Sequence, residues 1–100
     1  MKIVYAPTYE LKDDCGYSSP AGIELKDIDT LKDKISFDCK SDDYRIASLD
    51  ITFDDTVSLY FDYPKTLKVF YHSSADMHYQ IAKFDNYCIA DLIHYLDEYM

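Results

Sequence analysis

Glycine and arginine are both scarce in this 100-residue chain, which contains two glycines and a single arginine. Two separated glycines cannot form the glycine-rich loop whose backbone amides cradle phosphate groups in nucleotide-binding proteins. Arginine recognises phosphate through a fork of donors, so its near absence and the formal net charge of −9 argue against direct nucleic-acid binding. The same negative charge would repel an anionic membrane surface.

Long apolar runs are also missing, and no stretch approaches the length of a membrane-spanning helix. The N-terminal sequence MKIVYAPTYE turns polar too early for a secretory signal peptide, so we expect a cytoplasmic protein. The three cysteines, Cys15, Cys39 and Cys88, are odd in number and widely spaced, which predicts reduced thiols. No CxxC or HxxxH pair is present, so the sequence predicts no metal site and no cofactor.

Adjacent acidic residues occur three times, as Asp13-Asp14, Asp42-Asp43 and Asp54-Asp55. Each pair falls in a predicted turn, where the short Asp side chain bonds to its own backbone. The calcium-loop pattern of alternating acids with a central glycine is absent. Ser73 and Ser74 lack the strand–turn–helix elbow of a catalytic serine. We therefore predict no catalytic residues and no enzymatic activity.

An alternation of apolar and polar residues runs from Arg45 to Ser73 and predicts three antiparallel strands with one buried face. In the first of them, every second residue from Ala47 to Phe53 is predicted to face the core, and Ile46 to face away. Two tight turns, at residues 54–56 and 64–66, would join the strands.

Cross-strand partners must lie on the same face of the sheet, and this rule predicts the register of both hairpins. Leu49 should lie opposite Phe61 across the first turn, and Asp62 opposite Lys68 across the second. The outer face would then carry one row of side chains formed by Asp50, Tyr60 and Phe70.

The N-terminal part is predicted to contain a short strand from Lys2 to Ala6, which Pro7 either ends or places at a sheet edge, and then a loop over residues 8–22. Ile28, Leu31 and Ile35 have helical spacing, and they predict a short helix near residues 27–35 with Asp27 as its N-cap. Residues 35–38 could equally begin a strand.

The C-terminal part is predicted to contain a strand from His78 to Phe84, with Tyr79 and Ile81 pointing into the core. An amphipathic helix should follow, because an apolar stripe runs from Ile89 to Met100. The predicted fold is a single α+β domain over residues 1–100. It has a four- to five-stranded mainly antiparallel sheet, a short helix near residues 27–35 and a C-terminal helix packed on one face.

The negative charge is concentrated in residues 41–100, which contain eleven acidic residues against four basic ones. Most of the acids are Asp, and eleven residues are Tyr, a side chain enriched at interfaces. These features predict a surface that binds a basic protein, formed by Asp42, Asp43, Asp50, Asp54, Asp55, Tyr60, Asp62 and Phe70. The alternative is that the acids are only a solvated surface.

In size, acidity and absence of catalytic motifs the whole chain resembles two groups of small inhibitors. One comprises the phage-encoded DNA mimics, including anti-CRISPR and antirestriction proteins. The other comprises the bacterial immunity proteins, which neutralise a basic nuclease toxin. The resemblance implies a basic nucleic-acid-processing partner and inhibition by DNA mimicry. A third class, a structural or assembly subunit, would form a homodimer through the face that carries Tyr60 and Phe70.

Overall fold

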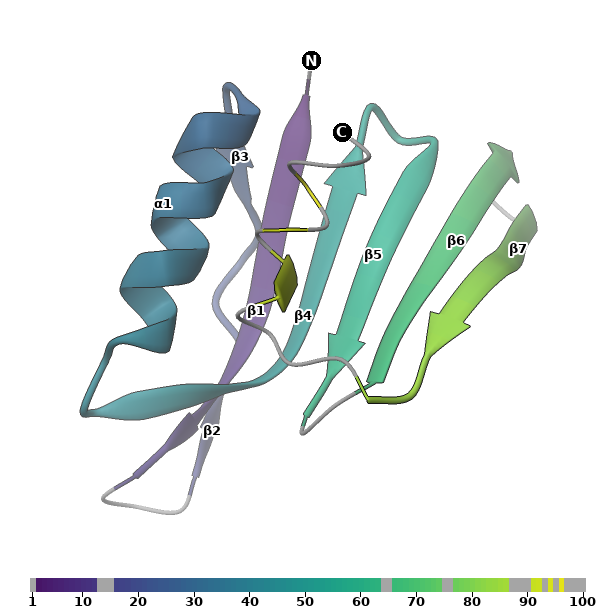
Figure 1. Cartoon of the computed structure of the whole chain (residues 1–100). Helices are drawn as coiled ribbons and strands as arrows, with labels where there is room; N and C mark the ends of the chain where they lie inside the picture. Colours follow the sequence, from purple (N-terminus) through teal and green to yellow (C-terminus); the bar gives the residue numbers. More distant parts are fainter. Residues whose placement is uncertain are drawn as a thin grey trace.

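The computed structural model describes residues 2–12, 16–63, 66–74, 77–86, 91, 92, 94 and 96, without the side chains of residues 73, 74 and 78. Within these residues the chain forms a seven-stranded antiparallel sheet with helix α1 on one face (Figure 1). The elements in chain order are β1 (Ile3–Leu11), β2 (Tyr17–Ser18), β3 (Ile23–Leu25), α1 (Ile28–Cys39), β4 (Tyr44–Phe53), β5 (Val57–Asp62), β6 (Thr66–Ser74) and β7 (Met77–Phe84). The strand order is β2–β1–β4–β5–β6–β7, and β3 also pairs with β1.

The predicted fold class is wrong in the number of strands and in the position of the main helix. The described residues form seven strands instead of four or five, and α1 lies in the middle of the chain. β2 and β3 were missed because they are only two and three residues long. Both lie close to turn-forming residues, which mask a strand pattern.

β1 is longer than predicted, since it continues through Pro7 to Leu11. Proline lacks a backbone N–H, and this loss normally confines it to strand ends and edges. Here β3 pairs with residues 3–5 of β1 and β2 with residues 9 and 10. Pro7 therefore lies in the gap between β2 and β3, where no described strand needs its N–H.

Helix α1 begins where the sequence predicts but ends at Cys39, four residues later than predicted. Asp27 is the N-cap, and its side chain accepts a hydrogen bond of 2.8 Å from the backbone N–H of Thr30. Leu31 and Ile35 are completely buried against the sheet. The alternative that residues 35–38 begin a strand is wrong.

The predicted fold with a C-terminal helix is also corrected, because α1 is the one helix element of the described residues, and Ile89 and Met100 are not among them. Residues 91, 92, 94 and 96 have helical backbone conformation. Leu92 and Leu96 are completely buried and belong to the same hydrophobic core as α1 and the sheet.

The predicted register between the first two central strands is confirmed. β4 and β5 pair with Leu49 opposite Phe61 and Asp50 opposite Tyr60, around a turn at residues 54–56. The predicted register between β5 and β6 is wrong by two residues. Thr66, and not Lys68, lies opposite Asp62. A shift of two residues keeps every side chain on its face, so the hydrophobic pattern cannot tell the two registers apart.

A bulge at Ala47 reverses the predicted alternation at the start of β4. Thr8 pairs with Ser48 and Tyr9 with Ile46, so Ala47 has no partner on β1. Ile46 is consequently buried, although the alternation predicts that it faces away from the core. The extra residue moves side chains that precede it to the opposite face.

The core lies between the inner face of the sheet and α1. Its fully buried side chains come from all of the longer elements except β7, which contributes the partly buried Ala82. Its buried members are Ile3, Tyr5, Leu31, Ile35, Ile46, Leu49, Ile51, Phe53, Leu59, Phe61, Leu67, Val69, Leu92 and Leu96. Tyr79 lies on the inner face as predicted, opposite Tyr71, but it is 49% exposed because the core does not reach it. The prediction that Ile81 points into this core is wrong, since Ile81 is 62% exposed. Helix α1 lies beside β1 and β4, at the end of the sheet away from β7 (Figure 1). Ile81 is a bulge residue and has no partner on β6.

Candidate functional site

The carboxylate of Asp38, in the last turn of α1, is a buried charged group with several close contacts. Leu31 and Ile35 precede Asp38 on the helix face that meets the sheet. Asp38 therefore occupies a core position and is only 1% exposed. A buried carboxylate is costly unless hydrogen bonds replace its hydration.

Three tyrosine hydroxyls supply these hydrogen bonds. Tyr5 and Tyr9 of β1 each donate to Oδ2 of Asp38 at 2.7 Å, and Tyr44 of β4 donates to Oδ1 at 2.9 Å. Lys34, one turn earlier on α1, places its Nζ 3.2 Å from Oδ1. We name these five residues the Asp38 cluster. They join the end of α1 to the two adjacent strands β1 and β4.

The bulge at Ala47 makes this arrangement possible. Strict alternation from Leu49 would turn Arg45 towards the core and Tyr44 away from it. With the extra residue, Tyr44 reaches Asp38 and its ring centroid lies 4.4 Å from that of Tyr9. Arg45 is consequently exposed on the outer side.

The protonation states in the cluster follow from the same contacts. Burial by itself would raise the pKa of Asp38, but the hydrogen bonds from Tyr9, Tyr5, Tyr44 and Lys34 outweigh it and hold the pKa below its ordinary value. Burial, followed by the hydrogen bond to Asp38, raises the pKa of Tyr5 and Tyr9 far above the ordinary range of a phenol. At neutral pH the carboxylate is ionised and the phenols are protonated. This pattern stabilises the fold and does not prepare a group for proton transfer.

Acidification should weaken the fold through Asp38. The folded-state pKa lies below the unfolded-state value, so the contribution of Asp38 to the free energy of unfolding is complete above about pH 4 and is lost as the pH falls through the folded pKa. Urea unfolding at about pH 6 and about pH 3 measures this loss, and Asp38→Asn, which has no carboxyl to titrate, should lose less. An equal loss of stability in both proteins would contradict the claim that titration of Asp38 weakens the fold.

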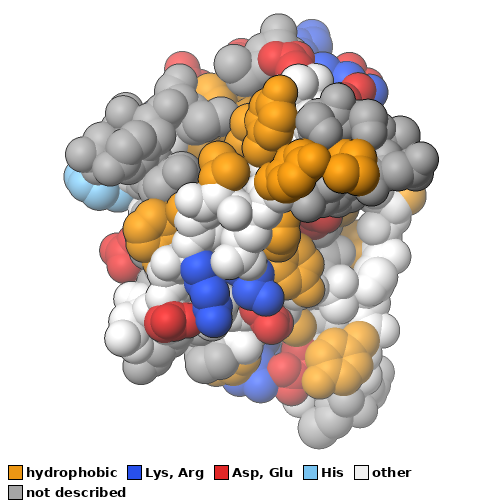
Figure 2. Space-filling view, turned by 90° about the vertical axis from the view of Figure 1, so that its right-hand side faces the viewer, with side chains coloured by type: hydrophobic (Ala, Val, Ile, Leu, Met, Phe, Trp, Pro, Cys, Tyr) orange, Lys and Arg blue, Asp and Glu red, His pale blue; other side chains and the backbone are white. Residues whose placement is uncertain are grey.

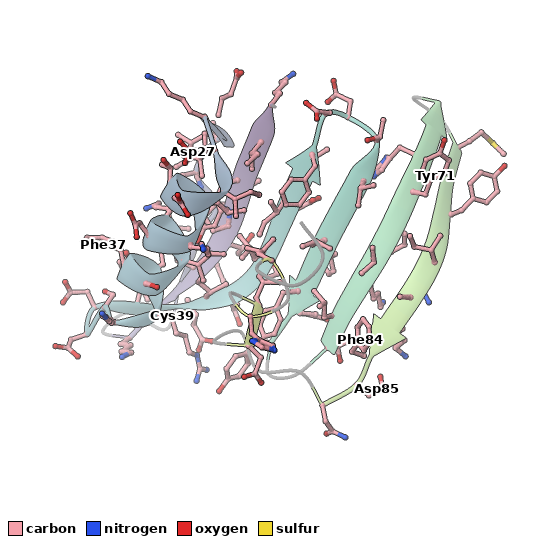
Figure 3. The ribbon with its side chains drawn as sticks, turned by 45° about the horizontal axis from the view of Figure 1, so that its top comes forward. Asp27, Phe37, Cys39, Tyr71, Phe84 and Asp85 are labelled. Atoms are coloured by element: carbon pink, nitrogen blue, oxygen red, sulfur yellow. The ribbon has the colours of Figure 1, made fainter. Side chains whose placement is uncertain are left out.

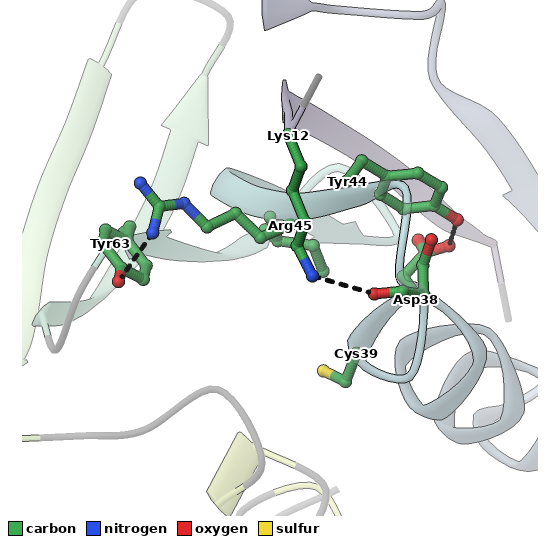
Figure 4. Close-up of a pocket in the computed structure, with 8 residues that line it drawn as sticks. Lys12, Asp38, Cys39, Tyr44, Arg45 and Tyr63 are labelled. Atoms are coloured by element: carbon green, nitrogen blue, oxygen red, sulfur yellow. Dashed lines mark hydrogen bonds between the residues drawn. The ribbon is translucent and has the colours of Figure 1, made fainter. Parts of the chain in front are cut away.

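A pocket of about 140 Å³ lies beside the cluster, at the C-terminal end of α1 (Figure 4). Arg45 forms one wall, and its guanidinium donates to Glu10 at 2.7 and 2.9 Å and to the Tyr63 hydroxyl at 3.1 Å. It also stacks on the Tyr63 ring, 4.5 Å from the centroid. Lys12 donates from Nζ to the carbonyl oxygen of Ser41 at 3.4 Å. The cationic groups of this pocket are already engaged with the protein itself.

The thiol of Cys39 also lines this pocket. Burial, followed by the negative charge of Asp38, raises the pKa of Cys39 above its ordinary value. A reactive cysteine needs a lowered pKa, so the surroundings of Cys39 favour an inert thiol. Cys39 is a free cysteine, as predicted, and Cys15 and Cys88 lie outside the described residues.

The six acids of the predicted binding surface are all exposed, but they do not form one group. Asp42 and Asp43 lie in the loop before β4, whereas Asp54 and Asp55 lie in the turn after it. A ten-residue strand separates the two pairs by about 30 Å at 3.3 Å per residue. Asp54 and Asp55 have φ of 49° and 59°, a region that Asp tolerates better than most residues. Asp54 also accepts the backbone N–H of Lys2 at 2.7 Å.

The remaining predicted residues lie on the outer face of the sheet. Asp50 and Tyr60 are direct cross-strand partners. Lys68 takes the place next to Tyr60 that was predicted for Phe70, which lies opposite Ser58. Tyr60 and Phe70 are half-buried. The outer row therefore begins with an acid on β4 and ends with lysines on β6 and β7, where Lys83 lies opposite Lys68.

The Asp38 cluster was not predicted from the sequence, although one signal was present. Asp38 follows Leu31 and Ile35 at the spacing of the apolar stripe, and it lies in the last helical turn, where the helix dipole disfavours an acid. An acid at such a position needs buried donors. Tyr5 and Tyr44 can be identified as those donors only after the pairing of β1 with β4 is known.

Comparison with known proteins gives no family assignment: no family model, no curated protein and no solved structure matches this chain. No helix among the described residues is long and apolar enough to cross a membrane. The described residues also contain no group of three or more His, Cys, Asp or Glu side chains that could hold a metal ion.

Proposed function

We propose that this protein is a small acidic, non-catalytic binding protein that inhibits a basic nucleic-acid-processing protein by occupying its phosphate-binding cleft. The observation that carries the proposal is that all six predicted acids are exposed while the net charge of the chain is −9. An anti-defence inhibitor of the anti-CRISPR or antirestriction kind acts by this chemistry. The mechanism is steric and electrostatic competition, and no covalent bond is made or broken.

The distribution of the acids supports an extended contact. The loop before β4, the outer face around Asp50 and the turn after β4 together present carboxylates over about 30 Å. DNA is also a line of regularly spaced negative charges, with one charge per about 1.7 Å of the duplex axis. Tyr60 lies directly beside Asp50 and adds apolar contact area next to the charge.

The lysines of the outer face restrict where a basic partner would bind. Lys68 lies opposite Lys83 on β6 and β7, and Lys83 forms an ion pair with Asp85 at 3.4 Å, so this side offers no net negative charge to such a partner. The contact should therefore involve β4, β5 and the two acidic loops, and it should avoid the β6–β7 side. Phe70 of β6 lies at the margin of this surface.

The Asp38 cluster supports a binding role over an enzymatic one. Its one ionised carboxylate already accepts four close contacts, which leaves little capacity for a substrate. We propose a cytoplasmic location for this role, in agreement with the free thiol of Cys39.

An immunity protein against a basic nuclease toxin would use the same surface chemistry and is the alternative. The coding neighbourhood separates the two, because a toxin gene directly upstream indicates immunity and a phage early region indicates an anti-defence inhibitor.

Charge reversal at Asp42 and Asp43 should slow association with the partner and weaken its salt dependence, because both side chains are exposed in a loop. This pair is a better target than Asp54 and Asp55, which bond to Lys2 in a left-handed turn. The matched control is Glu24→Lys with Asp33→Lys, which changes the net charge equally at exposed positions outside the proposed contact.

The measurement begins with capture of the partner from a host lysate at low and high salt. Labelled duplex DNA then competes with this protein for the captured partner. Simultaneous and independent binding of DNA and this protein would show that mimicry is wrong. Unchanged association in the Asp42→Lys, Asp43→Lys variant would show that the loop is only a solvated surface.

A further inference from the structure

The two edges of the sheet differ in a way that matters for association. One edge is formed by β2 and β3, which are two and three residues long and leave a gap beside Pro7. Very short edge strands and proline are the usual protection against edge-to-edge pairing. The opposite edge is β7, which is eight residues long, and no described strand pairs with its outer side. The bulge at Ile81 and the exposed Lys83 protect its C-terminal part, whereas residues 77–80 contain no bulge, proline or lysine.

β7 also carries apolar side chains that the fold leaves exposed. Met77, Tyr79 and Ile81 are 47%, 49% and 62% exposed, and Tyr71 of β6 lies directly opposite Tyr79. In Figure 3, the labels Phe37 and Cys39 mark helix α1, and Tyr71 lies at the other end of the sheet, away from this helix. Figure 2 views the molecule from the β7 side and shows hydrophobic side chains gathered on the upper part of that face.

The charge of this edge identifies its partner. Residues 66–85 comprise β6, β7 and Asp85, the ion-pair partner of Lys83, and with Lys68, Lys83, Asp76 and Asp85 they are neutral overall, so the remaining residues carry the whole net charge of −9. A basic partner would find no net attraction here. Two copies of this acidic chain, by contrast, would meet with the least repulsion at this edge.

We propose that β7 is the self-association edge of this protein and that a second copy pairs with it in an antiparallel manner about a two-fold axis. The two free strand edges would satisfy each other's backbone N–H and C=O groups. Tyr79 and Ile81 of each copy would contribute contact area next to the pairing. A two-fold contact of this kind is closed, so association stops at the dimer.

The dimer does not depend on the function proposed above and does not obstruct it. β4 and β5 are separated from β7 by β6, so the outer face around Asp50 stays open in both copies. The loop residues Asp42 and Asp43 belong to the distant end of β4.

Sedimentation velocity at several protein concentrations tests the proposal. The wild-type chain should sediment as a dimer at high concentration, and Ile81→Lys should shift the protein to monomer, because an exposed lysine on an edge strand opposes pairing. The matched control is Ile23→Lys, an exposed isoleucine on the edge strand β3, which should leave the dimer intact.

Hydrogen exchange of the wild-type protein provides a second measurement that needs no variant. The outward amides of β7 should exchange more slowly as the concentration rises, while those of β2 and β3 should not change. A wild-type monomer at all concentrations, a dimer that survives Ile81→Lys, or a dimer that Ile23→Lys disrupts equally would overturn the proposal.

Discussion

Asp38→Ala should lower the free energy of unfolding by about 2–4 kcal/mol, because it removes the charged acceptor of three tyrosine hydrogen bonds, and a hydrogen bond to a charged group contributes about 1.5–3 kcal/mol. The substitution leaves Lys34 without its ion-pair partner and the hydroxyls of Tyr5, Tyr9 and Tyr44 without their acceptor. The Tyr5 hydroxyl forms its bond in a buried environment, and an unsatisfied buried donor alone costs about 1–3 kcal/mol. The end of α1 should lose its attachment to β1 and β4.

Urea unfolding of the variant and of Asp33→Ala measures this effect with its control. Asp33 is an exposed acid of the same helix, and its removal should change stability by less than about 0.5 kcal/mol. Tyr44→Phe removes one hydroxyl and should cost about 1 kcal/mol. If Asp38→Ala is as stable as Asp33→Ala, the cluster does not hold the helix to the sheet.

Leu96→Ala should cost about 2–5 kcal/mol, and Leu92→Ala a similar amount, because both side chains are completely buried in the common core. Each substitution removes apolar contacts and leaves a cavity that the surrounding residues only partly fill. A total stability of about 5–15 kcal/mol is normal for a domain, so either change removes a large share of it.

Leu92→Met is the matched control, since it conserves volume and should cost less than about 1.5 kcal/mol. Thermal melting of the three variants and the wild type compares them directly. An unchanged melting temperature in Leu96→Ala would mean that the segment containing Leu96 contributes nothing to the core.

The sequence predicts the hairpin of β4 and β5 correctly because two independent constraints agree there. Leu49 and Phe61 must share the buried face, and Asp54 and Asp55 suit a tight turn. Each constraint alone leaves several registers open, but both together leave one.

The register of β5 and β6 depends instead on a contact that the local pattern does not contain. Tyr63 follows β5, and its backbone N–H donates to the carbonyl oxygen of Ala47 in β4. Its ring lies under the Arg45 guanidinium. These contacts hold Tyr63 at the bulge of β4, and the hairpin closes between Asp62 and Thr66. Neither contact can be predicted before the bulge at Ala47 is known.

The Asp38 cluster was missed for the same physical reason. Tyr5 and Tyr9 each lie about thirty residues before Asp38 in the sequence. Local patterns report only the nearest neighbours along a helix or strand. The acids of the predicted binding surface, by contrast, were correctly placed at exposed positions, because turn residues and outward strand positions follow directly from the alternation.

The position of β1 inside the sheet has a consequence for the order of folding. Its pairing with β4 joins Ile3 to Phe53 and Leu11 to Tyr44, whereas the pairings of β4 with β5, β5 with β6 and β6 with β7 each join strands that follow one another in the chain. Closing a long loop costs more chain entropy than closing a short turn. We therefore expect the meander of β4 to β7 to form first. β1 must then wait until β7, which ends at Phe84, has been synthesised before it can complete the sheet.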